Sequence, residues 1–180
     1  MKIRHGFVSN SSSSSFIIIA PKNMEPTADN FHQAIWGTDE KLEFPAMYGG
    51  AYGDIPVDPK AIAEDIVRQI EEGHQEDGYG DESRKIMDLA AVIEADDGPD
   101  MDDYIIPPAD GVKSSSYDWP AYEAAVDVAN EKAAATMLEK YPDSDFYVVS
   151  YGDGEGSFNA AVEHGPALND SDKIIRYNHH

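Results

Sequence analysis

No apolar run in the chain is longer than five residues, and the run richest in β-branched residues spans Phe16–Ala20 and reads FIIIA. Its three isoleucines are β-branched, a side-chain type that packs well in strands, and Pro21 ends the run because proline cannot donate to a sheet ladder. Five residues are far fewer than the roughly 20 that a membrane-spanning helix needs. We therefore expect Phe16–Ala20 to form a buried strand.

Two segments carry strong helix signals. In the first, Asp58 is a good N-cap, Pro59 suits the first helical position and Gly73 suits the end. Its apolar residues recur at helical spacing on one face: Ile62, Ile66, Val67 and Ile70. The second segment opens at Asp118-Trp119-Pro120 and runs to about Tyr141, before Pro142. Its expected inward face comprises Tyr122, Val126, Ala129, Ala133 and Met137.

Other elements have weaker signals. One or two helical turns are expected around Asn30–Trp36, and a further helix from Asp81 or Ser83, with Ile86, Leu89, Ala90 and Ile93 on one face. Near the C-terminus we expect strands at 146–151, 157–162 and 173–177. The turn GDGEG would join the first two as a hairpin.

These elements predict an α+β fold. The expected sheet is small and antiparallel, and consists of the N-terminal strand, the C-terminal hairpin and the last strand, with about three helices packed on it. The length of 180 residues favours a single domain over 1–180. Runs rich in Gly, Pro and Asp predict irregular acidic loops near 37–58, 73–82 and 94–117.

The charge balance excludes some partners. With 35 acidic residues against 13 basic ones, the net charge is −22, and such a chain repels nucleic-acid phosphates and anionic lipid. We therefore expect no direct nucleic-acid binding and no membrane binding. The acidity fits three uses: solubility on solvated helix faces, cation binding, or imitation of a polyanion that attracts DNA-binding proteins. The absence of cysteine excludes disulfides and thiolate metal sites.

A serine run precedes the apolar segment. A run of this kind can be a flexible linker, a polar loop that wraps an anion, or a set of phosphate acceptors. Because FIIIA follows without a linker, we favour a specified loop beside the C-terminal strand, with Phe7 and Phe16 anchored in the core. The residues of this motif are Gly6, Phe7, Val8, Ser9, Asn10, Ser11, Ser12, Ser13, Ser14, Ser15 and Phe16.

The opening sequence MKIRHGFVSNSSSSSFIII resembles the N-terminus of a group of uncharacterised bacteriophage and prokaryotic proteins. These proteins share a leader of the form Met-Lys-x-Arg-x-Gly-Phe-Val-Ser-Asn, followed by serines and a phenylalanine. The resemblance covers about the first 19 residues, and KIIRYNHH at residues 173–180 is similar to the close of some such proteins. It implies a phage or prophage origin and supplies no catalytic residues. A leader shared in this way also fits a common modification, targeting step or partner.

Catalytic motifs are weak. The sequence has no Gly-x-Ser-x-Gly elbow, no phosphate-binding Gly-x-x-x-x-Gly-Lys loop and no EF-hand spacing. The best constellation for chemistry combines C-terminal histidines with acids, a ligand set that suits a divalent cation. The residues of this candidate metal site are Asp153, Glu155, His164, His179 and His180.

The function that the sequence favours is a protein–protein interaction, with a host factor or within a virion or phage assembly. A polyanion mimic belongs to this class. The alternative is a metal-dependent hydrolase that uses the C-terminal histidines with Asp153 or Glu155. Lys2 and Arg4 suggest a secretion signal, but FVSNSSSSSF interrupts the apolar region that a signal needs. We therefore expect a cytoplasmic or virion-associated protein that is not secreted.

Overall fold

The computed structural model describes residues 13–38, 58–73, 83–93, 95, 97–108, 115–152 and 157–178. The chain divides into two compact units, one made of residues 1–86 with 143–180 and the other of residues 87–142. The prediction of a single domain stays a prediction. The predicted α+β class is confirmed by four described helices, a four-stranded antiparallel sheet and a two-stranded one.

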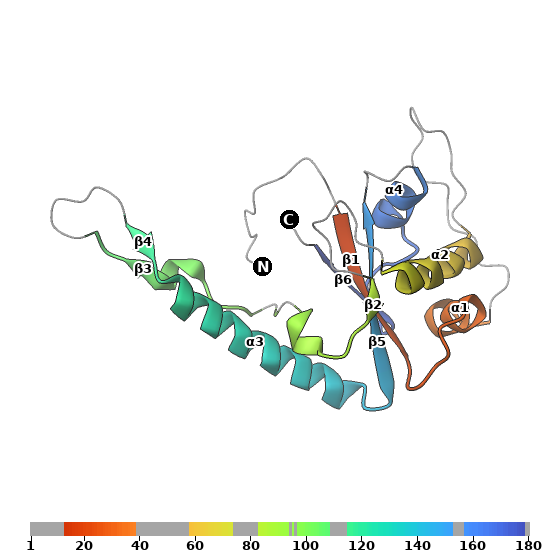
Figure 1. Ribbon diagram of the computed structural model, residues 1–180, viewed down its shortest axis with the longest axis horizontal. Helices are drawn as coiled ribbons and strands as arrows, with labels where there is room; N and C mark the ends of the chain where they lie inside the picture. The colour runs from red at the N-terminus through yellow and green to blue at the C-terminus, as the bar shows by residue number, and fades with distance from the viewer. Residues whose placement is uncertain are drawn as a thin grey trace. The chain divides into compact units, whose positions relative to one another are not determined.

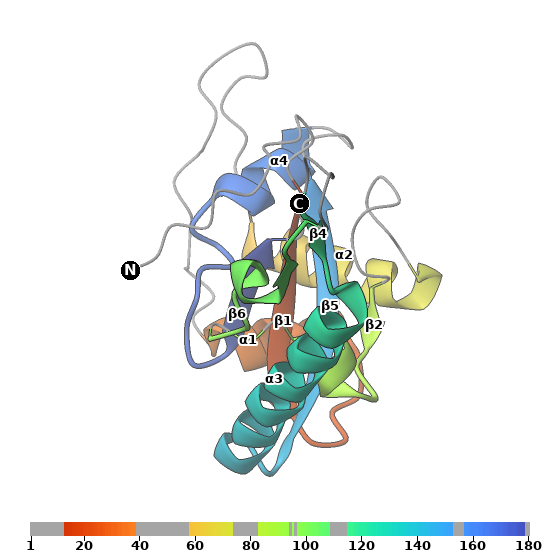
Figure 2. The same ribbon diagram turned by 90° about the vertical axis from the view of Figure 1, so that its left-hand side faces the viewer.

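The first unit is built on the four-stranded sheet. Its strands are β1 (Ser13–Pro21), β2 (Arg84–Lys85), β5 (Ser144–Gly152) and β6 (Ile174–Asn178), in the order β2-β5-β1-β6. Figure 2 shows the four strands side by side in this order. All three pairings are antiparallel, so β1 lies between β5 and β6.

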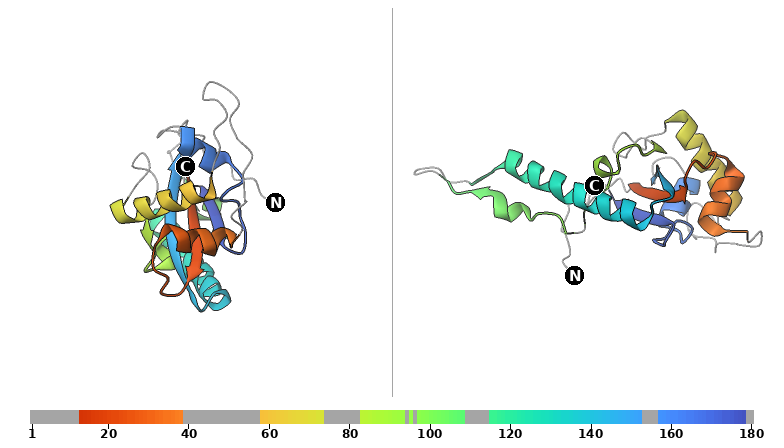
Figure 3. Two further views of the ribbon diagram at one scale, coloured as in Figure 1. Left: turned by 90° about the vertical axis from the view of Figure 1, so that its right-hand side faces the viewer. Right: turned by 90° about the horizontal axis from the view of Figure 1, so that it is seen from below.

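Three helices cover one face of this sheet: α1 (Ala28–Trp36), α2 (Pro59–Glu72) and α4 (Ser157–His164). Figures 1 and 3 show them on the same side of the strands. Phe16 and Ile18 of β1 point toward these helices and pack with the helical residues in one apolar core. The core residues that the helices contribute are Phe31, Ile62, Ala63, Ile66, Ala161 and Val162.

Several expected elements are confirmed. α2 begins after Asp58, whose side chain accepts a hydrogen bond from the Lys60 amide, and it ends at Gly73 in the left-handed conformation. α1 and the strands β5 and β6 lie where the sequence predicts them.

The predicted C-terminal hairpin is wrong. Residues 157–162 belong to helix α4, and β5 and β6 each pair with β1. The helix has a physical reason, because Phe158, Ala161 and Val162 follow the spacing of three and four residues that places them on one helical face. Ala161 and Val162 on that face are fully buried.

The predicted helix at 83–93 is also wrong. Arg84 and Lys85 form β2, and the next amide, that of Ile86, donates to the Phe146 carbonyl on β5. The only helical turn described in this stretch is a 3₁₀ turn, η2 (Leu89–Ala91). Pairing with a strand 60 residues away therefore overrides a local helical pattern.

The second unit contains the longest described helix, α3 (Trp119–Lys140), capped by Asp118. Its predicted inward face is partly buried along its length, and Ala134 is the one buried residue of the helix. The remaining elements are η2, η3 (Met101–Tyr104), β3 (Ile105–Ile106) and β4 (Ser116–Tyr117), and β3 pairs with β4. The loop expected near 94–117 thus contains a 3₁₀ turn and a short ribbon, while most of the loops near 37–58 and 73–82 lie outside the described residues.

Both edges of the four-stranded sheet are protected. On the outer edge of β6, the Ile174 amide donates to Ser171 Oγ at 3.1 Å and the Arg176 amide to Asp170 Oδ1 at 2.6 Å. On the opposite edge, β2 consists only of Arg84 and Lys85. Short, charged or capped edges prevent strands of other molecules from adding to a sheet.

Removal of the β6 caps is expected to increase self-association. Asp170→Ala combined with Ser171→Ala exposes two edge amides to other strands, while water solvates them in the isolated chain, so stability falls by less than about 1 kcal/mol. Sedimentation velocity over a concentration series measures the change. Asp172→Ala, an exposed neighbour with the same change of charge, is the control, and an equal response of both variants would contradict the capping role.

Asp145 links β5 to β2 and to the turn after β1. Its Oδ2 atom accepts hydrogen bonds from Lys85 Nζ and from the Asn23 amide, both at 2.7 Å. Burial acts to raise the pKa of Asp145, but these hydrogen bonds and the nearby lysine charges outweigh it and hold the pKa below its ordinary value of 3.8. The ionised carboxylate therefore stabilises the fold above about pH 4.

Asp145→Asn is expected to lower the free energy of unfolding by about 1 kcal/mol at pH 7, a value kept small because the Lys85 side chain is 40% exposed. The difference from the wild type shrinks as the pH falls through 4, where the wild-type carboxylate gains its proton. Urea unfolding of both proteins at pH 7 and pH 3 measures it. A deficit that stays constant over this range would rule out the ion pair as its cause.

Candidate functional site

The serine motif is only partly described, because Gly6–Ser12 lie outside the described residues. Ser13, Ser14 and Ser15 belong to β1 and pair with β5, and Ser14 and Ser15 also pair with β6. The predicted serine loop is therefore wrong for these three residues. The strand continues through them because partner strands are available on both sides. Phe16 is buried in the core, as expected.

The hydroxyls of Ser14 and Ser15 are buried on opposite faces of the sheet and are hydrogen-bonded. Ser15 Oγ lies 2.9 Å from Ser150 Oγ on β5. Ser14 Oγ donates to Glu163 Oε1 on α4 at 3.2 Å and accepts from Arg176 Nη2 on β6 at 3.0 Å. Both serines are only 2% exposed, so a phosphate group on either would have to be buried. Their role is to join strands and a helix.

Glu163 is the centre of this polar network on the helical face. Its side chain is 2% exposed, and His164 Nε2 lies 3.5 Å from its second carboxylate oxygen. The guanidinium of Arg176 also stacks over the Phe16 ring, 5.5 Å from the ring centre. A buried carboxylate is tolerated only where hydrogen bonds or charges compensate for lost hydration. Ser14 supplies one such bond.

A second buried polar network surrounds Gln69 on α2. Gln69 Oε1 accepts from Ser83 Oγ at 2.8 Å and from the Ser150 amide at 3.3 Å, and Gln69 Nε2 donates to Asp65 at 2.9 Å. Gln69 thereby satisfies an amide of β5 beyond the end of the short strand β2. Asp65, which accepts from Gln69, also acts on the buried Tyr151 of β5. Burial raises the pKa of Tyr151 well above its ordinary value, and the negative charge of Asp65 raises this pKa further.

Sequence reasoning missed Gln69 and Glu163. The signal for Gln69 was present, because it follows Ile62 and Ile66 on the buried face of α2 at helical spacing. A polar residue at such a position indicates a buried hydrogen-bond partner. Glu163 gave no comparable signal, since the residues directly before it, 157–162, were expected to form a strand.

The predicted metal site is largely outside the described residues, which omit Asp153, Glu155, His179 and His180. His164 is described and lies at the end of α4, beside Glu163. Within the described ranges, no three His, Asp or Glu side chains are grouped so that they could share a metal ion. The divalent-cation site stays a prediction.

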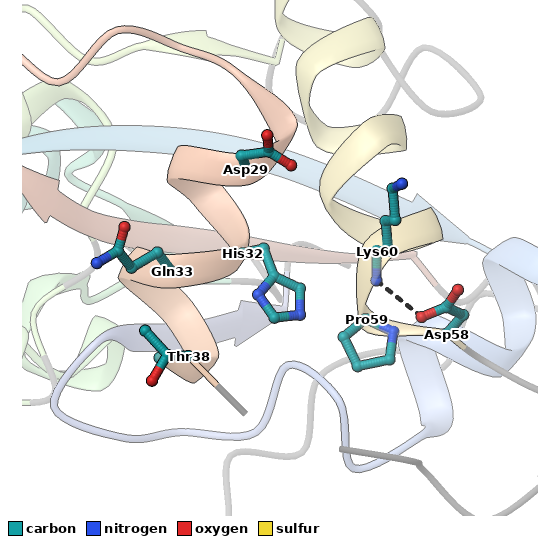
Figure 4. Close-up of a pocket in the computed structure, with 8 residues that line it drawn as sticks. Asp29, His32, Gln33, Thr38, Asp58, Pro59 and Lys60 are labelled. Atoms are coloured by element: carbon teal, nitrogen blue, oxygen red, sulfur yellow. Dashed lines mark hydrogen bonds between the residues drawn. The ribbon is translucent and has the colours of Figure 1, made fainter. Parts of the chain in front are cut away.

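A cavity of about 510 Å³ lies between α1 and the start of α2. Figure 4 shows His32 pointing toward Pro59, and the hydrogen bond from the Lys60 amide to Asp58. Acidic, basic and neutral side chains are mixed along its wall, which favours no single class of ligand. The residues that line it are Asp29, His32, Gln33, Gly37, Thr38, Asp58, Pro59 and Lys60.

The second unit carries an exposed surface of large apolar side chains. Trp119 is 50% exposed and packs against Tyr117 and Tyr122, with ring centres 5.9 and 6.1 Å apart. Tyr122 in turn contacts Tyr104 at 5.6 Å. Ile105 and Ile106 of β3 are 41% and 45% exposed. We call the surface formed by the rings and Ile105 the aromatic patch; its residues are Tyr104, Ile105, Tyr117, Trp119 and Tyr122.

Local structure positions the aromatic patch. The pairing of Ile105 with Tyr117 places their side chains on the same side of the β3-β4 ribbon. Asp118 then caps α3, and its amide donates to the Tyr104 carbonyl at 2.8 Å. The ribbon and the first turn of α3 therefore hold the aromatic rings together. Sequence analysis assigned Tyr122 to an inward face and overlooked its exposed neighbours.

No described helix is both long enough and apolar enough to cross a bilayer. α3 has 22 residues and therefore the length, but it lacks the apolar composition. Comparison of the chain with protein-family models, with curated proteins and with solved structures gives no match.

Ser14→Ala is expected to lower the free energy of unfolding by about 1–3 kcal/mol, because a buried carboxylate loses a hydrogen-bond donor. In a Glu163→Gln background the same substitution is expected to cost less, since a neutral amide is cheaper to leave without that donor. Urea denaturation of the four proteins of this cycle measures the coupling. Equal costs in both backgrounds would show that Ser14 does not act through Glu163.

Proposed function

We propose that this chain is a protein-interaction module, which binds a host factor or a component of a phage assembly through the aromatic patch. The observation that carries the proposal is Trp119, half exposed and in ring contact with Tyr117 and Tyr122. Tryptophan and tyrosine dominate the binding energy of protein interfaces because they combine large apolar area with polar tips. Exposed neighbouring side chains of this kind mark a contact surface more often than scattered single ones.

The character of the first unit supports this assignment. Its core is apolar, both edges of its sheet are protected, and its buried serines and glutamine are occupied in structural hydrogen bonds. The first unit thus has the properties of a stable scaffold. The phage setting rests on the resemblance of the N-terminal leader, and imitation of a polyanion is one form that the interaction could take, given the charge of −22.

Trp119→Ala combined with Ile105→Ser is expected to weaken partner binding at least tenfold, which corresponds to about 1.4 kcal/mol. Quantitative affinity purification from the host cell identifies proteins retained by the wild type, and titration with each purified protein then gives the dissociation constant. Val128→Ser, which changes an apolar residue of α3 that is 65% exposed and outside the patch, is the control. Circular dichroism verifies that all variants are folded.

Equal binding of a retained protein by the wild type and by the patch variant would refute the aromatic patch as the contact surface. A loss of binding in the Val128→Ser control as large as in the patch variant would do the same.

A further inference from the structure

We propose that the partner of the aromatic patch is a basic protein surface, in which Lys or Arg side chains surround an apolar centre. This inference rests on the proposed function and adds the chemistry of the partner. It follows from the charges around the patch and from what aromatic rings bind.

Exposed carboxylates are direct chain neighbours of several residues of the aromatic patch. Asp102 and Asp103 of η3 directly precede Tyr104, Asp118 separates Tyr117 from Trp119, and Glu123 follows Tyr122. All four acids are exposed. Residues 87–142 contain 13 acidic and three basic residues. The side chains next to the patch therefore present negative charge to any approaching partner.

The two basic residues that the structure describes in this unit lie away from the patch, and the third, Lys113, lies outside the described residues. Lys132 and Lys140 are on the later turns of α3, and at 1.5 Å per residue Lys132 is roughly 20 Å along the helix axis from Trp119. This distance exceeds the Debye length of about 8 Å at physiological ionic strength. Neither lysine therefore offsets the carboxylates at the patch.

Charge decides between the kinds of protein that could cover the patch. A two-fold contact with a second copy would bring the same carboxylates face to face, and like charges in an interface oppose association. A basic partner gains attraction from the same carboxylates. Aromatic faces also bind guanidinium and ammonium groups directly, through cation–π contacts. The apolar centre and the acidic border thus favour the same class of partner.

Three labelled synthetic peptides of 16 residues test this inference. They carry the same leucines and tryptophan, and their remaining positions are all lysine, all glutamine or all glutamate. Fluorescence polarisation at 50 and 300 mM salt gives the affinities. We expect the lysine peptide to bind at least tenfold more tightly than the glutamine peptide, with a clear loss of affinity at high salt.

Matched variants separate local from overall charge. Asp102→Asn with Asp103→Asn removes two charges beside the patch, whereas Glu64→Gln with Glu71→Gln removes two exposed charges from α2. The first pair is expected to weaken binding of the lysine peptide about fivefold or more, and the second pair by less than twofold. Trp119→Ala is expected to weaken it at least tenfold.

The other outcomes overturn the inference in distinguishable ways. If both double substitutions weaken binding of the lysine peptide equally and Trp119→Ala does not weaken it, the peptide is attracted unspecifically to an acidic protein. Salt-independent binding of the glutamine peptide that is lost in Trp119→Ala would uphold the patch as a docking surface and refute a basic partner. Concentration-dependent dimers that Trp119→Ala abolishes, measured by sedimentation velocity, would identify a second copy as the occupant. Absence of binding by all three peptides would also overturn it, while the proposed function is decided separately by its own titration.

Discussion

The pairing of β1 with both β5 and β6 is the interaction on which the first unit depends. This one strand contributes Phe16, Ile18 and Ala20 to the core beneath the helices, and it aligns Ser14 and Ser15 with polar partners from three other elements. Ser14 reaches Glu163, 149 residues later in the chain. Without β1 in place, β5 and β6 have no common neighbour, and α4 loses the strand to which Glu163 is bonded.

Local signals were sufficient for some elements and not for others. Asp58, Pro59 and Gly73 set both ends of α2 through capping, which depends on neighbouring residues alone. The strand at Arg84–Lys85 exists only because β5 offers a free edge, which no local pattern reveals. α4 was misread because residues 157–162 are too short a segment for periodicity to separate a strand from a helix, although Phe158, Ala161 and Val162 carry the helical spacing.

The candidate surface was harder to predict than the fold. Trp119 and Tyr122 lie on a helix whose apolar residues extend around its circumference, so periodicity could not tell which of them face solvent. The side chains that gather beside them are positioned by the short β3-β4 ribbon, which holds Ile105 opposite Tyr117. The acidity of this region was visible in the sequence, but its bearing on the class of partner was not. Acidic residues indicate a kind of binding partner only where they lie beside an exposed apolar surface, and the sequence does not show that surface.

The place of β1 in the sheet has a consequence for synthesis of the chain. The segment FIIIA leaves the ribosome more than 120 residues before the β5 residues that pair with it. During that interval it is an unpaired apolar strand, the kind of segment that aggregates. The serines directly before it and the proline directly after it act as gatekeepers, since polar residues and proline flanking such a segment hinder its stacking with other nascent chains. Ser14 and Ser15 thus act before folding as well as in the folded sheet, where their hydroxyls are hydrogen-bonded.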